Sequence, residues 1–231
     1  MMERLILFDL DGTLIRSHHG FIAFNEAIQK TFGLSADIRT VIPDGNTDPL
    51  ILEDIFATAN LEVEITRERW ETFAFHLHQC YTHAVQKGVT RIFPLPGVLE
   101  LVKELAEIEG LYQGVVTGNI ETTGRLKLDA AGLGPYLGLG AYGSDSRNRT
   151  DLPRIAKERW EKAIGRLLPS SHCTVVGDTP KDLDAARKGR MKCLLVGTGR
   201  YPLEELELSG PDACLSDFTD TKATVEALLR S

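Results

Sequence analysis

Residues 5–14 of the chain read Leu5-Ile6-Leu7-Phe8-Asp9-Leu10-Asp11-Gly12-Thr13-Leu14. Four apolar residues followed by carboxylates and a glycine indicate a buried strand that ends in a polar turn. In doubly wound sheets, ligands bind at the carboxyl ends of the strands. Because Gly12 permits a sharp turn, Asp9 and Asp11 can both face a ligand there. The stretch therefore predicts a chemical site at the end of the first strand.

The same pattern, an apolar run followed by a turn, recurs along the chain. Short apolar runs, each followed by a turn and a helical pattern, lie at Leu5–Phe8, Gly114–Val116, Thr174–Val176 and Cys193–Val196. Helical periodicity covers 98–108, 120–131, 153–168 and 180–188. Strand, turn and helix repeated in this order predict an α/β fold: a Rossmann-like, doubly wound parallel sheet with helices on both faces.

One segment, 16–93, interrupts this alternation. It contains no convincing strand, and helical patterns lie near 19–32, 47–60 and 66–87. We therefore expect two domains, a core formed by 1–15 and 94–231 and an inserted all-helical cap over 16–93. The hinges are expected near Arg16-Ser17 and near Phe93-Pro94-Leu95-Pro96.

Composition and charge exclude several classes of partner. The chain has 231 residues, of which 26% are charged, and its formal net charge is -7. An acidic chain without a basic block is a poor ligand for nucleic acid and for anionic membrane surfaces. No apolar run is long enough for a membrane span, and no cleavable signal precedes the first strand, so a cytoplasmic protein is expected. The sequence does not reveal the oligomeric state.

Two further strands also end in polar residues. The second continues into Thr117-Gly118-Asn119, and the fourth continues into Gly177-Asp178-Thr179-Pro180-Lys181-Asp182. The hydroxyl of Thr117 and the backbone amides of Gly118 and Asn119 can donate to phosphoryl oxygens at the start of a helix. Taken alone, each motif is equally well explained as a helix cap.

Taken together and in this order, the motifs resemble those of the haloacid dehalogenase superfamily. The helical insert resembles the cap of its phosphoglycolate phosphatase-like branch. The resemblance implies a magnesium-dependent phosphatase in which Asp9 attacks phosphorus and forms an aspartyl-phosphate, while Asp11 acts as acid and base. It also implies roles in catalysis for Thr117, in substrate binding for Gly118, Asn119 and Thr47, and in binding Mg²⁺ for Asp9, Asp11, Asp178 and Asp182.

The basic third motif departs from the usual pattern of the superfamily. Many relatives have Lys-Pro-x-Pro there, whereas this chain reads Arg147-Asn148-Arg149-Thr150-Asp151-Leu152-Pro153. Arg149 is best placed to neutralise negative charge beside the nucleophile, and Arg147 is the alternate. Lys127 lies about two turns inside a helix, about 10 Å from its start, and is expected to be a surface or packing residue.

The physiological substrate cannot be read from these motifs. Segment 16–93 has seven Lys or Arg against ten Asp or Glu, so a small phosphorylated metabolite is expected rather than a large polyanion. A phosphomutase of the β-phosphoglucomutase type shares every core motif and stays open as an alternative. Asp11 argues against a dehalogenase, which has no leaving alkoxide to protonate. A binding protein without activity is disfavoured because Asp9, Asp11 and Asp178 are all present.

Overall fold

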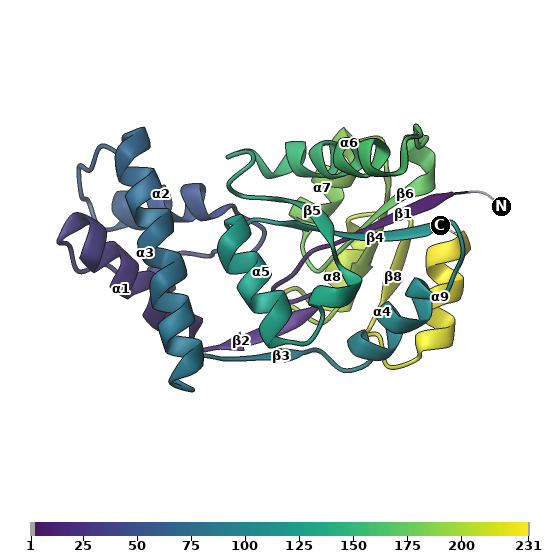
Figure 1. The fold of residues 1–231 in the computed structure, drawn as a ribbon, viewed down its shortest axis with the longest axis horizontal. Coiled ribbons are helices and arrows are strands. Elements are labelled where there is room, and N and C mark those ends of the chain that lie inside the picture. Colours follow the sequence, from purple (N-terminus) through teal and green to yellow (C-terminus); the bar gives the residue numbers. More distant parts are fainter. Residues whose placement is uncertain (1–2, 231) are drawn as a thin grey trace.

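The computed structural model describes residues 3–230 and places β1 (Arg4–Phe8) inside a six-stranded parallel sheet (Figure 1). The strand order is β5-β4-β1-β6-β7-β8. The other five strands are β4 (Leu111–Thr117), β5 (Leu139–Tyr142), β6 (Cys173–Gly177), β7 (Lys192–Val196) and β8 (Ala213–Leu215). The α/β, Rossmann-like core predicted from the sequence is confirmed.

Side chains of β1 are buried on both faces of this sheet. Leu5 and Leu7 pack into one apolar cluster, whereas Ile6 and Phe8 pack into another. Successive side chains of a strand point to opposite faces, so a strand covered on both faces is apolar throughout. The face of Ile6 and Phe8 is covered by α4 (Val98–Ala106), α5 (Glu121–Ala130) and α9 (Thr221–Arg230). The opposite face is covered by α6 (Leu152–Ile164), α7 (Pro180–Lys188) and α8 (Leu203–Leu208).

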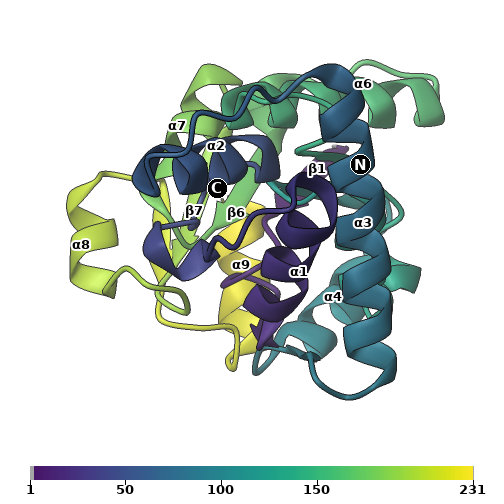
Figure 2. The ribbon, with the colours of Figure 1, turned by 90° about the vertical axis from the view of Figure 1, so that its left-hand side faces the viewer.

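Three further helices lie beyond the carboxyl end of β1, facing the viewer in Figure 2. They are α1 (Gly20–Phe32), α2 (Asp48–Thr58) and α3 (Arg67–Gln86), which share an apolar cluster of their own. A two-stranded antiparallel ribbon, β2 (Ile15–His18) and β3 (Arg91–Pro94), joins this part to the sheet. The expectation of an insert without strands is therefore wrong at its two ends, because β2 and β3 lie there and overlap the two expected hinges.

Helix α3 presents its apolar side to the other helices of the insert. Its buried residues Phe73, Leu77, Tyr81 and Ala84 recur at helical spacing, and the side chain of Thr66 accepts a hydrogen bond from the amide of Arg69 at its start. Most other residues of the helix are polar, although Phe75 is 60% exposed. Within residues 3–230, no helix is both long enough and apolar enough to cross a bilayer.

Candidate active site

Residues that are far apart in the sequence meet where three neighbouring strands end. Strand β1 lies between β4 and β6, so the turns after these strands are adjacent. A cavity of about 430 Å³ opens between these turns and the helices of the insert. Six of the residues predicted from the sequence line it, namely Asp9, Asp11, Thr117, Gly118, Asn119 and Arg149.

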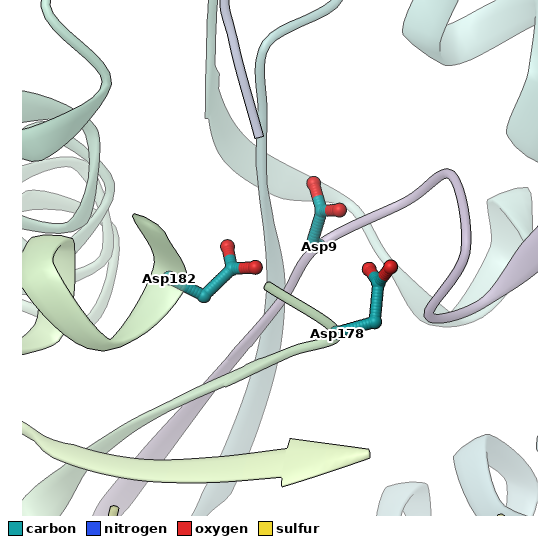
Figure 3. A group of neighbouring side chains, drawn as sticks. All are labelled: Asp9, Asp178 and Asp182. Carbon is teal, nitrogen blue, oxygen red and sulfur yellow. The ribbon is translucent and has the colours of Figure 1, made fainter. Parts of the chain in front are cut away.

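Three buried carboxylates lie close together (Figure 3), and one of them, Asp9, lines the cavity. Asp9, Asp178 and Asp182 each offer an oxygen atom, and these atoms lie within 4.8 Å of one another. Burial raises the pKa of Asp9 to about 7, although Arg149 opposes the shift. Burial and the charge of Asp9 raise the pKa of Asp178 to about 8. The cluster therefore holds negative charges whose mutual repulsion a cation would relieve.

The oxygen ligands at Asp178 are of the kind that binds a small divalent cation, and the residues around it fix the orientation of its carboxylate. Carboxylate oxygens are the ligands that Mg²⁺ prefers in proteins. The hydroxyl of Thr13 donates to one oxygen of Asp178 at 2.8 Å and fixes its orientation. Gly12 and Gly199 crowd the same carboxylate, because a Cβ atom at either position would collide with it. Gly12 also has a φ of 88°, which a residue with a side chain rarely adopts.

Arg149 connects two of the three carboxylates. Its Nη2 atom lies 2.9 Å from Asp9 Oδ1 and 2.5 Å from Asp182 Oδ1. The other oxygen of Asp182 accepts hydrogen bonds from the backbone and the hydroxyl of Thr179 at the start of α7. Because protein donors engage both of its oxygens, Asp182 is better placed to orient Arg149 than to bind a metal directly. Arg147, the alternate candidate, is exposed and pairs with Glu53.

Replacing Arg149 with methionine is expected to lower the free energy of unfolding by about 3 kcal/mol, because Asp9 and Asp182 lose their buried counter-charge. Arg149→Lys keeps the charge and should lose less. Arg147→Met is the matched control, since its exposed ion pair contributes less than about 1 kcal/mol. Urea unfolding of the three variants in chelator measures these differences. Equal stability of Arg149→Met and Arg147→Met would contradict a buried electrostatic role for Arg149.

The structure corrects the expectation that Lys127 is a surface or packing residue. Its buried Nζ atom lies 2.7 Å from Asp11 Oδ2 and 2.7 Å from Asn119 Oδ1, and 5.2 Å from the centre of the Tyr81 ring. Burial opposes the charge of this ammonium group, but Asp11 and Tyr81 outweigh it and raise the pKa of Lys127. Side chains of a helix tilt toward its N-terminus, so the long stem carries the ammonium back to the start of α5.

Asp11 belongs to a hydrogen-bonded network that continues to Thr117. Asn119 Nδ2 donates to Asp11 Oδ2 at 2.8 Å and to Thr117 Oγ1 at 2.8 Å. Because the Thr117 oxygen accepts this bond, its own proton can be donated to a ligand in the cavity. Burial opposes ionisation of Asp11, yet Lys127 and Asn119 lower its pKa. The pKa of Asp9 is raised and that of Asp11 is lowered, whereas an attacking carboxylate needs a low pKa and a general acid a raised one, so a bound cation and an incoming phosphate would have to shift both.

Thr47 does not line the cavity, so its predicted contact with the substrate has no support in this geometry. Its side chain is fully buried, and its hydroxyl donates to the carbonyl of Arg147 at 2.8 Å. The neighbouring residues Gly45 and Asn46 line the cavity instead. Asp48 accepts a hydrogen bond from the amide of Ile120 at 2.8 Å. The start of α2 is thereby attached to the turn that follows β4.

Comparison with known proteins agrees with the order of these motifs. A family model described as haloacid dehalogenase-like hydrolase matches residues 3–190 of the chain. The chain belongs to the haloacid dehalogenase-like hydrolase family. The resemblance inferred from the motifs is therefore confirmed, and the matched range includes the carboxylate cluster, Arg149 and the insert.

Similar haloacid dehalogenase-like proteins carry phosphatase or hydrolase names. A probable phosphatase IndB from Dickeya dadantii is 28% identical over 231 residues, which cover 99% of this chain and 96% of that protein. A phosphoglycolate phosphatase from Pectobacterium atrosepticum is 28% identical over 225 residues, which cover 94% of this chain and 90% of that protein. The crystal structure of a hydrolase from Pseudomonas syringae has 25% identity and a TM-score of 0.71, and covers 97% of this chain and 98% of its own.

Proposed function

We propose that this chain is a magnesium-dependent phosphatase that hydrolyses a small phosphate monoester through an aspartyl-phosphate on Asp9. The observation that carries the proposal is the position of Asp9, which lies in a cavity at the end of β1 between Arg149 and the carboxylate of Asp178. Relatives named phosphatases that match nearly the whole chain support the same reaction class.

In the first step, an oxygen of Asp9 forms a bond to phosphorus while the bond from phosphorus to the ester oxygen breaks. A carboxylate can approach a phosphate dianion only where negative charge is neutralised, and Arg149 supplies one positive charge at that place. A magnesium ion held by Asp9, Asp178 and the backbone carbonyl of Asp11 would supply further neutralisation and polarise the phosphoryl group.

Asp11 acts on the leaving group in the first step and on water in the second. The incoming phosphate dianion places negative charge beside Asp11, which favours its protonated form, and the proton then passes to the departing alkoxide. The resulting carboxylate takes a proton from the water that attacks the aspartyl-phosphate. Lys127 and Asn119 hold Asp11 in place for both steps through their contacts with Oδ2.

The turn after β4 holds the phosphoryl oxygens. The hydroxyl of Thr117 can donate to one of them, and Gly118 and Asn119 line the cavity beside it. Gly118 is required for the approach of the insert, because a Cβ atom there would collide with the carbonyl of Asn46. The insert therefore comes within backbone contact of the phosphate-binding turn.

Residues 16–93 form a cap over a catalytic core made of 1–15 and 94–231. The separate apolar cluster of α1, α2 and α3 and the β2–β3 ribbon support this division. A cap placed over the cavity excludes water, which strengthens the electrostatic interactions with phosphorus.

Phosphate release should require magnesium. Chelator is expected to abolish the release of inorganic phosphate from a panel of phosphorylated metabolites, and added magnesium is expected to restore it. The assay measures free phosphate, because a phosphomutase returns the phosphoryl group to its product and releases almost none. Undiminished release in metal-free buffer, or isomerisation of a sugar phosphate without release, would contradict the proposal.

A further inference from the structure

We infer that the organic part of the substrate is uncharged and apolar, and that the cap binds it. The inference rests on the proposed phosphatase activity and specifies its substrate class. It is carried by two features of the cavity, the composition of its cap-side wall and the pairing of its charged side chains.

The cap supplies an apolar wall to the cavity. We call the residues Phe21, Phe24, Ile38, Val41, Leu77 and Tyr81 the apolar wall; the cap also lines the cavity with the polar residues Ser17, His19, Arg39, Asp44, Asn46 and Asp48. Phe21, Ile38 and Val41 are only half-buried, so part of their apolar surface is open to a ligand. The volume of about 430 Å³ lies in the range of about 300–1,000 Å³ that is typical of small-molecule sites. A phosphoryl group beside Asp9 would leave this wall uncovered, whereas an apolar substituent would bury it.

Among the described residues, every Lys or Arg that lines the cavity is already paired with an aspartate, although the pairs of Arg39 and Arg200 are exposed. Its four Lys or Arg residues form the pairs Arg39–Asp37, Lys127–Asp11, Arg149–Asp9 and Arg200–Asp44, at 2.6, 2.7, 2.9 and 2.8 Å. Arg39 also lies over the ring of Phe21, with its guanidinium carbon 4.2 Å from the ring centre. A carboxylate or a second phosphate on the substrate would therefore compete with an aspartate that is already in place.

Asp48 adds to this discrimination against anions. It lines the cavity, and burial raises its pKa to about 6, so at pH 7 it is mostly ionised. A substrate anion near the start of α2 would meet this negative charge in a site of low dielectric constant. Two-carbon diacids such as 2-phosphoglycolate, and pyrophosphate, fit the cavity less well than an ester with an apolar body.

A series of straight-chain alkyl phosphates tests this inference in the wild-type protein. Ethyl, butyl and hexyl phosphate share a primary alcohol as leaving group, so acid catalysis contributes equally to all three. Each methylene that becomes buried is expected to raise kcat/KM about fourfold, which gives on the order of 10²-fold between ethyl and hexyl phosphate. 2-Phosphoglycolate should be hydrolysed less efficiently than hexyl phosphate.

The outcomes separate this inference from the proposed function. If the protein releases phosphate but kcat/KM is flat along the series, or is highest for 2-phosphoglycolate, the inference fails and the phosphatase assignment survives. If no ester releases phosphate in the presence of magnesium, the proposed function fails, and the inference fails with it.

Variants of the cap-side wall give a second test with matched controls. Phe21 and Val41 line the cavity, whereas their neighbours Ile22 and Ile42 do not and are 37% and 57% exposed. Phe21→Ala is expected to lower the ratio of kcat/KM for hexyl over ethyl phosphate about tenfold, and Val41→Ala a few-fold. Ile22→Ala and Ile42→Ala should leave this ratio unchanged. Because the readout is a ratio, partial unfolding does not alter it. An unchanged ratio in both wall variants would overturn the inference.

Discussion

Replacing Asp9 with asparagine is expected to reduce phosphate release from every ester by at least about 10⁴-fold. The variant lacks the attacking oxygen anion, so no phosphoenzyme can form whatever the leaving group is. Alkyl and aryl phosphates should therefore be affected alike. Initial rates of phosphate release with saturating magnesium measure the loss, and urea unfolding shows whether the variant is folded.

Rapid hydrolysis of an aryl phosphate by folded Asp9→Asn would show that another group attacks phosphorus. Glu53→Gln is a suitable control for the removal of a carboxylate, because Glu53 pairs with Arg147 outside the cavity lining. Its rates should stay close to those of the wild-type protein.

Replacing Asp11 with asparagine should produce a different defect, one that depends on the leaving group. General acid catalysis contributes about 10²–10⁴-fold, so the hydrolysis of alkyl phosphates should fall by this factor. An aryl phosphate has a leaving group that departs without a proton, and its first step should be affected much less. The burst of released phenol, followed in rapid-mixing experiments, measures this step separately from the later attack of water.

Equal losses in the rate of the first step for alkyl and aryl esters would contradict the acid role of Asp11. Asparagine at position 11 keeps the size of the side chain and a carbonyl oxygen that Lys127 and Asn119 can contact. The defects of Asp9→Asn and Asp11→Asn can therefore be compared directly. The change of charge is then the main difference between the variants and the wild-type protein.

The parts of the site that could be predicted from the sequence are those defined by local pattern. Asp9, Thr117 and Asp178 each directly follow or end a strand that carries a buried apolar run, and parallel strands bring such ends together. Arg149 was predicted from the resemblance to the superfamily, whose basic third motif lies before the helix that corresponds to α6. The structure places this side chain, rather than Arg147, against Asp9.

Short elements were missed because they carry too few residues for a period to be visible. β2, β3 and β5 have four residues each, and β8 has three. Their pairing partners can also lie far away in the sequence, since β2 pairs with a strand from the far end of the insert. Local pattern alone cannot reveal such a partner.

Lys127 was misjudged for a geometric reason, although the sequence holds a signal that identifies it. The buried face of α5 consists of Thr123, Gly124, Lys127 and Leu128, so the lysine lies on the inner stripe of the helix. A charged residue on such a stripe needs a partner of opposite charge, and Asp11 is that partner. Thr47 was misjudged because its contact with Arg147 depends on how the insert meets the core.

The central claim, that Asp9 carries the phosphoryl group, is tested most directly by mass spectrometry of the intact protein. Asp11→Asn lacks the base for the second step, so with magnesium and an aryl phosphate it should accumulate one phosphoryl group per chain. Peptide mapping should locate this group on Asp9. The double variant with Asp9→Asn should never gain it. A phosphoryl group on the double variant, or on any residue other than Asp9, would contradict the account.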